Sequence, residues 1–144
     1  MSGLGPIITT ASPRNEGLLK SLGATHILDR NLGRTELLTK IREVTEKPIQ
    51  LVCDSVAIAE TQNLAYDVVA SGGQLLLSLP SLIDPKKIVP DKQVIFFNGK
   101  VSIPEYSALD DEFLSVLPTY LKTGEIKVPI IPTSMPLYNA NSVI

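Results

Sequence analysis

Two nearly continuous apolar stretches constrain the fold of this chain most strongly: "IQLVCDSV", which begins at Ile49, and "QLLLSLP", which begins at Gln74. Neither stretch alternates apolar and polar residues, as a strand with one face in water does. Strands of this kind are typical of a parallel sheet that lies between two layers of helices. The segment between them, "AETQNLAYDVVA", predicts a helix that ends at Gly72 and Gly73. Strand, helix and strand together predict an α/β fold.

The same alternation of strand and helix extends over the rest of the chain. The opening run "PIITTASPRNEGLLKSLGATHILD" predicts a strand, a helix that Ser12 caps and Pro13 begins, and a second strand. A helix is expected over about 34–46, and another in "DDEFLSVLPTYLKTG", which Pro118 either kinks or divides. We expect parallel strands near 7–11, 26–29, 49–54, 74–79 and 93–97.

Composition and charge exclude several classes of function. With 144 residues, 44% of them hydrophobic and a net charge of −2, the chain suits one ordinary domain that binds neither nucleic acid nor an anionic membrane. It has no apolar run of ~18 residues and no secretory signal, so we expect a cytoplasmic protein. Residues 1–48 carry seven Lys and Arg against five acids, whereas the remainder carries six against ten. An anionic ligand is therefore expected near the first third.

Single cysteine and histidine residues limit the chemistry further. Cys53 has no partner for an internal disulfide, and its apolar surroundings predict a buried, unreactive thiol. With His26 as the only histidine, the chain cannot build the Cys and His ligand set of a zinc site, so we expect no metal. The tyrosines are not paired with any base, and no catalytic residue can be named.

Several strings together resemble a known family. The strings "SLGATHILDR", "CDSV", "AETQNLAYDVVASGGQLLLSLP" and "FFNG" are similar to the cofactor-binding domain of the medium-chain dehydrogenase/reductase superfamily, the zinc-type alcohol dehydrogenase-like proteins. Within it, "TASPRNEGLLKSLGATHILDR" is most similar to the zinc-independent quinone-reductase and enoyl-reductase-like branch. The similarity extends from about Gly3 to the tail. It implies a Rossmann-like, doubly wound parallel sheet.

The chain also departs from that family at its start. The resemblance implies a first strand, a glycine-rich turn and a helix before "GLGPIITTAS", and these are absent; "SGLG" is followed by a strand, so it is no pyrophosphate fingerprint. We therefore expect a C-terminal cofactor-domain fragment with an incomplete sheet. Residues 1–128 would form a partial dinucleotide-binding domain, and 129–144 an extended tail that would return to a missing catalytic domain. The sheet would break between its first and third strands, and the exposed strand edges would permit self-association.

The resemblance also implies a cofactor and the residues that bind it. Where an acid would bind the ribose 2′-hydroxyl of NADH, this chain has Ser12, Arg14 and Asn15, which suit the 2′-phosphate of NADPH. A capped helix start with a solvated arginine is an equally good interpretation of these three. Further contacts are implied near the adenine ribose and diphosphate by Asp54, Ser55 and Val56, and near the nicotinamide by Leu79, Pro80, Phe97, Asn98 and Gly99. As bare sequence, these are simply the ends of buried strands.

Two classes of function stay open at this point. One is the cofactor-binding portion of an NADPH-dependent oxidoreductase that transfers hydride to a quinone, carbonyl or enoyl substrate in the complete protein, and that is inactive as this isolated chain. The other is a non-catalytic remnant or interaction module that associates with a full-length relative. A strand, a glycine-rich turn and a barrel-like domain encoded in frame upstream of Met1 would favour the first.

Overall fold

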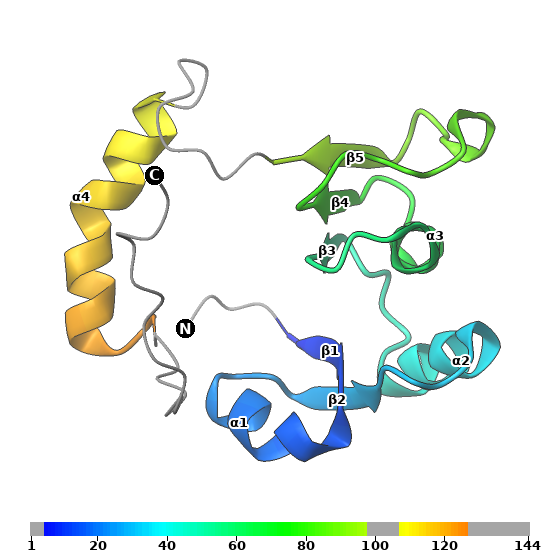
Figure 1. Ribbon diagram of the computed structural model, residues 1–144, viewed down its shortest axis with the longest axis horizontal. Helices are drawn as coiled ribbons and strands as arrows, with labels where there is room; N and C mark the ends of the chain where they lie inside the picture. The colour runs from blue at the N-terminus through cyan, green and yellow to red at the C-terminus, as the bar shows by residue number, and fades with distance from the viewer. Residues whose placement is uncertain (1–4, 98–106, 127–144) are drawn as a thin grey trace, which may run out of the picture. The chain divides into compact units, whose positions relative to one another are not determined.

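A computed structural model describes residues 5–97 and 107–126 of the chain. The chain divides into two units, the first up to Ser107 and the second from Ala108, and each is described by itself. The elements of the first unit are labelled in Figure 1, apart from two short 3-10 turns, η1 and η2. In chain order they are β1 (Ile8–Ala11), η1 (Pro13–Asn15), α1 (Glu16–Ser21), β2 (His26–Asp29), α2 (Arg34–Val44), β3 (Leu51–Asp54), α3 (Ala59–Val68), β4 (Gln74–Leu77), η2 (Pro85–Lys87) and β5 (Gln93–Phe96).

The five strands form two parallel sheets. β1 pairs with β2, and Ile8 lies opposite His26. The second sheet has the order β3-β4-β5, in which Leu51 lies opposite Gln74 and Gln74 opposite Gln93. The predicted α/β class, the parallel direction and the positions of all five strands are confirmed. Within the described residues no hydrogen bond joins the two sheets as neighbours, so the predicted break between β1 and β3 is confirmed as well.

Among the described residues, no strand pairs with one side of the β1 backbone. The carbonyls of Ile7 and Ala11 accept hydrogen bonds of 3.1 Å from amides at the two ends of β2. Because successive residues of a strand direct their N–H and C=O groups to opposite sides, those of Ile8 and Thr10 point away from β2. We call Ile8 and Thr10 the β1 edge.

β3 likewise has one side with which no described strand pairs. The carbonyls of Gln50 and Asp54 accept hydrogen bonds of 2.7 and 3.2 Å from amides at the two ends of β4. The N–H and C=O groups of the intervening Leu51 and Cys53 therefore point away from β4. We call Leu51 and Cys53 the β3 edge. Each sheet thus ends in a row of backbone groups that a further strand could pair with.

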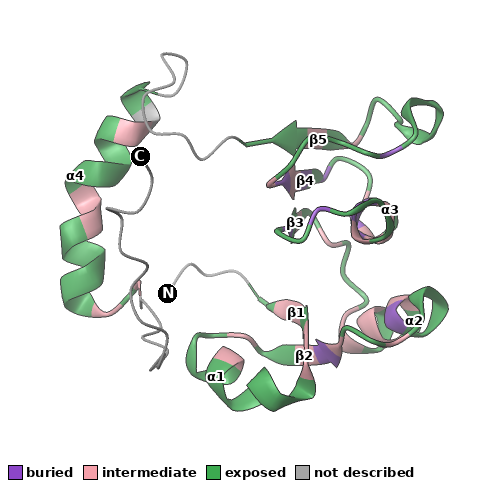
Figure 2. Ribbon diagram, in the orientation of Figure 1, coloured by how far each residue is buried: buried purple, intermediate pink, exposed green. Residues whose placement is uncertain are grey.

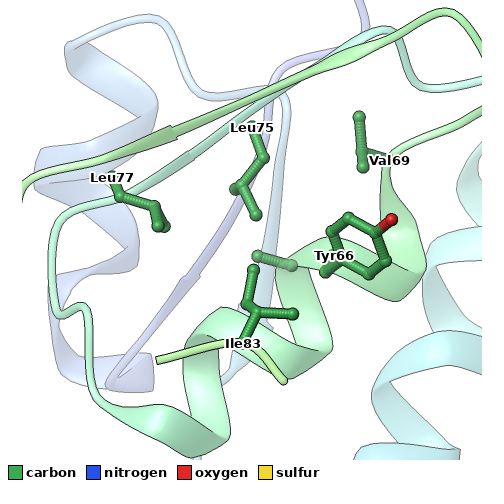
Figure 3. Close-up of a cluster of buried hydrophobic side chains, with 6 residues drawn as sticks. Tyr66, Val69, Leu75, Leu77 and Ile83 are labelled. Atoms are coloured by element: carbon green, nitrogen blue, oxygen red, sulfur yellow. The ribbon is translucent and has the colours of Figure 1, made fainter. Parts of the chain in front are cut away.

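The main hydrophobic core lies between α3 and one face of the three-stranded sheet (Figure 3). Leu75 and Leu77 of β4 are both 0% exposed, because β4 has a strand on either side and the helix below it. The other buried members of the cluster come from α3 and the loops that follow it and β4: Ala65, Tyr66, Val69 and Ile83. Val52 and Val94, from the strands on either side, pack against this cluster.

The opposite face of the same sheet is open in the described part of the first unit. Leu51 is 48% exposed and Ile95 is 37% exposed. Cys53, which lies two residues after Leu51 and across Leu76 from Ile95, is exposed too. The prediction of a buried Cys53 is therefore wrong. Side chains alternate along β3, so that Val52 faces α3 and Cys53 faces away from it. Figure 2 shows buried segments on β4 and α3, whereas β5 is largely exposed.

Gly73 is the one described glycine at which an added Cβ atom would meet other atoms within 4 Å. A Cβ atom at this position would lie 2.8 Å from Cγ2 of Val69, and 2.9 Å from the carbonyl oxygens of both Ala70 and Gln50. These atoms belong to the end of α3 and to the residue before β3, so only a glycine lets β4 begin there. The preceding Gly72 has a φ of 76°, which suits glycine for a different reason.

The second unit is described only as α4 (Ser107–Thr123) and the turn after it. The helix is continuous through Pro118, and Gly124, with a φ of 75°, follows its end. The expected domain boundary at residue 128 and the expected tail over 129–144 lie outside the described residues. In the ranges 5–97 and 107–126, no helix is long and apolar enough to cross a membrane.

Candidate functional site

The turn after β1 holds the first group of predicted site residues. Ser12 is half-buried at the start of η1, with Pro13 as its first residue. The Ser12 side chain makes no capping hydrogen bond; instead the amide of Asn15 donates to the Ser12 carbonyl at 2.9 Å. The predicted cap is wrong because the chain closes a 3-10 turn through its backbone before α1 begins. The hydroxyl of Ser12 is thus not used by the helix.

Arg14 extends into solvent from the same turn. Arg14 and Asn15 are both exposed. Two ion pairs are found in the described part of the chain, Glu16 with Lys20 at 2.6 Å and Arg34 with Asp67, and neither involves Arg14. The guanidinium is therefore available to an anionic group that approaches the end of β1.

Asp54 ends β3, and its carboxylate is turned into the protein. Oδ1 accepts hydrogen bonds from the amides of Val56 at 3.0 Å and Ala57 at 2.9 Å, and Oδ2 accepts one from Oγ1 of Thr61 at 2.7 Å. Asp54 is 7% exposed. These bonds hold Ala57 at a φ of 54°, a backbone conformation that residues other than glycine rarely adopt. The carboxylate thus shapes the loop, and the loop presents Val56 to solvent.

The residues after β3 and β4 lie together. Val56 is 61% exposed and Leu79 is 53% exposed, and Ser55 and Pro80 are exposed beside them. Oγ of Ser78 donates to the carbonyl of Ser55 at 3.1 Å, which joins the two loops directly. The two loops therefore form one rim at the carboxyl ends of neighbouring parallel strands, where open α/β sheets bind ligands.

Phe97 extends this rim to the third strand. Its amide donates to the carbonyl of Leu77 at 3.1 Å, and its side chain is 42% exposed. The predicted residues Asn98 and Gly99 lie outside the described residues. The structure thus brings together the predicted residues that follow β3, β4 and β5. Ser12, Arg14 and Asn15 follow a strand of the other sheet, and no hydrogen bond or ion pair within the described ranges joins them to this rim.

The sequence prediction missed Gln62, a residue of α3 that supports this rim. Gln62 is 0% exposed, and its amide bonds to the loops after both β3 and β4. A signal for it exists in the sequence. Gln62 stands three, four and seven residues before Ala65, Tyr66 and Val69, so a polar residue lies on the apolar face of its helix.

Other candidates contribute no chemistry to the site. The hydroxyl of Tyr66 accepts a hydrogen bond from the amide of Val89, in the loop before β5, at 2.8 Å, and Tyr66 belongs to the buried core cluster rather than to the rim. Among the residues described, no three His, Cys, Asp or Glu side chains gather as metal ligands would. A pocket of ≈190 Å³ lies between α2 and the end of α3, and none of the predicted site residues lines it.

Comparison with known sequences gives a family for most of the chain. Residues 1–102 match the family described as zinc-binding dehydrogenase. The trans-enoyl reductase FSL5 of Gibberella zeae is 37% identical over 73 residues, which cover 51% of this chain and 20% of that protein.

Solved structures agree with the fold described above. The CurK enoyl reductase has a TM-score of 0.65 at 18% identity, over 86% of this chain and 38% of that chain. Mycobacterial Rv1454c, solved with NADPH, has a TM-score of 0.64 at 23% identity, over 85% of this chain and 40% of that one. The nucleotide-binding subdomain of the PpsC enoylreductase domain from Mycobacterium tuberculosis has a TM-score of 0.62 at 17% identity, over 86% and 72%. The chain thus has the nucleotide-binding fold of enoyl reductases and spans well under half of the first and second of these structures.

Proposed function

Because this chain belongs to the zinc-binding dehydrogenase family, and its matched part is the C-terminal cofactor domain of the medium-chain dehydrogenase/reductase superfamily, we propose that it is the cofactor-binding portion of an NADPH-dependent oxidoreductase. The reaction of the complete protein would be hydride transfer to an enoyl or quinone substrate. Support for the enoyl class comes from the relative that is called a trans-enoyl reductase. NADPH would supply the hydride, and the chain would supply its position and electrostatic environment.

The turn after β1 carries the choice of NADPH over NADH. Arg14 is exposed and takes part in neither ion pair of the described residues, and Ser12 keeps a hydroxyl that its helix does not use. A guanidinium and a hydroxyl suit a phosphate dianion, whereas an acid in this turn would repel it. The exposed Arg14, which has no ion-pair partner among the described residues, is the observation on which the proposal depends.

The rim after β3, β4 and β5 would hold the rest of the dinucleotide. Ser55 and Val56 would flank the adenine ribose and diphosphate, and the exposed apolar side chains of Leu79 and Phe97 would lie toward the nicotinamide. The inward carboxylate of Asp54 would act indirectly, by holding the loop that carries the first two. We also keep the proposal that residues 129–144 return to a catalytic domain.

The test of the NADPH proposal replaces Arg14 with alanine. Hydrogen bonds between charged groups contribute about 1.5–3 kcal/mol, so Arg14→Ala should weaken NADPH binding on the order of ten- to a hundredfold and leave NADH binding nearly unchanged. Calorimetric titration of each dinucleotide into the wild-type and Arg14→Ala chains measures the two affinities. The difference should shrink at high salt, because an exposed phosphate contact is screened. Arg30→Ala is the matched control, since Arg30 is an exposed cation after β2, the neighbouring strand.

Equal losses of NADPH and NADH affinity in Arg14→Ala would contradict the proposal and make Arg14 a support of the turn. Equal losses in Arg14→Ala and Arg30→Ala would show a general effect of net charge instead. Should the wild-type chain bind neither dinucleotide, the assignment of a cofactor site to this chain would be wrong.

We further propose that the 144-residue chain alone does not turn over substrate. Alignment of both reactants supplies roughly 7–11 kcal/mol of barrier reduction in well-aligned systems. The hydroxyl–carboxylate pair described at the rim, Thr61 with Asp54, is turned into the protein. The chain mixed with NADPH and a panel of quinones, enals and enones should leave the absorbance of the reduced cofactor at the level of the buffer control. Steady oxidation above that level would disprove this.

A second candidate function is an interaction module that associates with itself or with a full-length relative. The specific observation in its favour is the pair of free strand sides, the β1 edge and the β3 edge, whose backbone groups point away from their own sheets. Such edges pair readily with strands of other chains. A charged substitution at the β3 edge, Leu51→Lys, tests this function because it should weaken association between chains.

A further inference from the structure

Gln62 makes three hydrogen bonds through its amide group, although it is 0% exposed. Its Nε2 donates to the carbonyl of Ala57 at 2.9 Å and to the carbonyl of Pro80 at 3.1 Å. Its Oε1 accepts from the amide of Leu82 at 2.7 Å. Among side chains, only the amides of Asn and Gln carry two N–H donors and an acceptor oxygen on one carbon. The two carbonyl partners require the nitrogen of Gln62, and the amide partner requires its oxygen.

The three partners of Gln62 belong to two loops that are distant in sequence. Ala57 lies in the loop after β3, which Asp54 holds from the other side. Pro80 and Leu82 lie in the loop after β4. One buried side chain of α3 therefore ties together two loops. Among the described residues, the other hydrogen bonds between these loops come from Ser78, whose hydroxyl donates to the carbonyls of Asp54 and Ser55 at 3.4 and 3.1 Å.

These are also the two loops that carry the proposed contacts to opposite ends of the dinucleotide. Ser55 and Val56 precede Ala57 directly, and Leu79 directly precedes Pro80. Gln62 therefore contributes, together with Ser78, to the separation between the two sets of contacts. A dinucleotide that is bound in position for hydride transfer has one spacing between its diphosphate and its nicotinamide, and a misplacement of about 1 Å is costly for the reaction.

We propose that Gln62 is a positioning residue that sets the spacing of the β3 and β4 loops for a bound nicotinamide dinucleotide. This inference rests on the proposed function, because the ligand is the one proposed there. No other side chain replaces the group. A glutamate would direct carboxylate oxygens at the carbonyls of Ala57 and Pro80, and an apolar side chain would leave those carbonyls and the amide of Leu82 buried without partners.

The experiment compares Gln62→Glu and Gln62→Met with Val69→Ala, all in the full 144-residue chain. Val69 is 1% exposed near the end of the same helix and packs in the core cluster, so its truncation destabilises the fold without removing a hydrogen bond of either loop. Urea is adjusted until the three variants have equal global stability. Amide hydrogen exchange at Ala57, Leu82 and Ile83 then reports the loops, and titration with NADPH reports binding.

At equal global stability, both Gln62 variants should exchange the loop amides about tenfold faster or more than Val69→Ala, because local opening no longer breaks the three bonds. NADPH affinity in the absence of urea should fall about tenfold or more in the Gln62 variants and much less in Val69→Ala. Equal exchange in all three would overturn the proposal, since Gln62 would then contribute stability alone.

NADPH binding and amide hydrogen exchange together distinguish a failure of the Gln62 proposal from a failure of the proposed function on which it rests. If the wild-type chain binds NADPH and Gln62→Met binds it equally well, the positioning role is wrong and the proposed function stands. If the wild-type chain binds no dinucleotide, the proposed function is wrong. If the wild-type chain binds no dinucleotide but the loop amides exchange faster in the Gln62 variants, Gln62 still sets the spacing of the loops. Unchanged exchange would overturn the role of Gln62 too.

Discussion

The two sheets of the first unit are built from similar strands and differ in how well they are buried. In the three-stranded sheet, Leu75 and Leu77 are 0% exposed, with a strand on each side and α3 packed on one face. In the two-stranded sheet, Leu28 is the one residue of the described strands that is buried, at 8% exposure, and β1 has none. The difference teaches that an apolar strand is buried by its neighbours, and its own composition only makes burial favourable.

Leucine-to-alanine substitutions should reveal the difference between the two sheets most strongly, as a difference in the free energy of unfolding. Leu75→Ala should lower the free energy of unfolding by about 2–5 kcal/mol, because it leaves a cavity in the best-packed part of the unit. Leu28→Ala should cost less, about 1–3 kcal/mol, because the two-stranded sheet can close around the missing atoms. Urea denaturation followed by circular dichroism measures both. Losses of equal size would mean that the two sheets are packed alike.

A charge on the β3 edge should reduce self-association. Leu51 is 48% exposed and its backbone groups point away from β4, so Leu51→Lys should weaken pairing between chains about tenfold by adding repulsion and desolvation at each new contact. Sedimentation velocity over a range of protein concentrations measures the effect. Leu82→Lys is the control, since Leu82 is 58% exposed and lies outside any strand. If the dissociation constant of Leu51→Lys equals that of the wild-type chain, association through this edge is ruled out.

The rate at which the Cys53 thiol is labelled tests the exposure of the open sheet face, and it is the smallest of the expected effects. Because Cys53 is exposed on the open face of its sheet, a maleimide should label the native chain at a rate within about tenfold of the rate in denaturant. Labelling that required unfolding of the chain would show that something covers this face in solution. The same measurement on the Leu51→Lys variant would show whether that cover is a second chain.

The sequence predicts the order and direction of the strands well, for a simple physical reason. Nearly continuous apolar runs that are separated by helical segments specify parallel strands joined by helices, and all five strands were found where they were expected. Burial was harder to predict. The run around Cys53 reads as covered on both faces, but composition contains no information about which neighbours are present, and the thiol is exposed.

The site was predicted as a set of positions, and their orientation had to come from the structure. The exposed rim after β3 and β4 includes the predicted Val56 and Leu79. The direction of the Asp54 carboxylate depends on amides and a hydroxyl within seven residues of it, which no strand pattern reveals. Gln62 was missed because its role depends on the loop after β4, 18 to 20 residues further along the chain.

Gly73 has a genetic consequence that follows from its crowded position. Every amino acid other than glycine has a Cβ atom, and here that atom would collide with the carbonyl oxygens of Ala70 and Gln50 as well as with Val69. Any missense change in this codon should therefore be damaging, whatever the chemistry of the new side chain. Homologues in which another residue stands at this position would need a rebuilt junction between helix and strand. In a deep mutational scan, this site should tolerate no replacement at all.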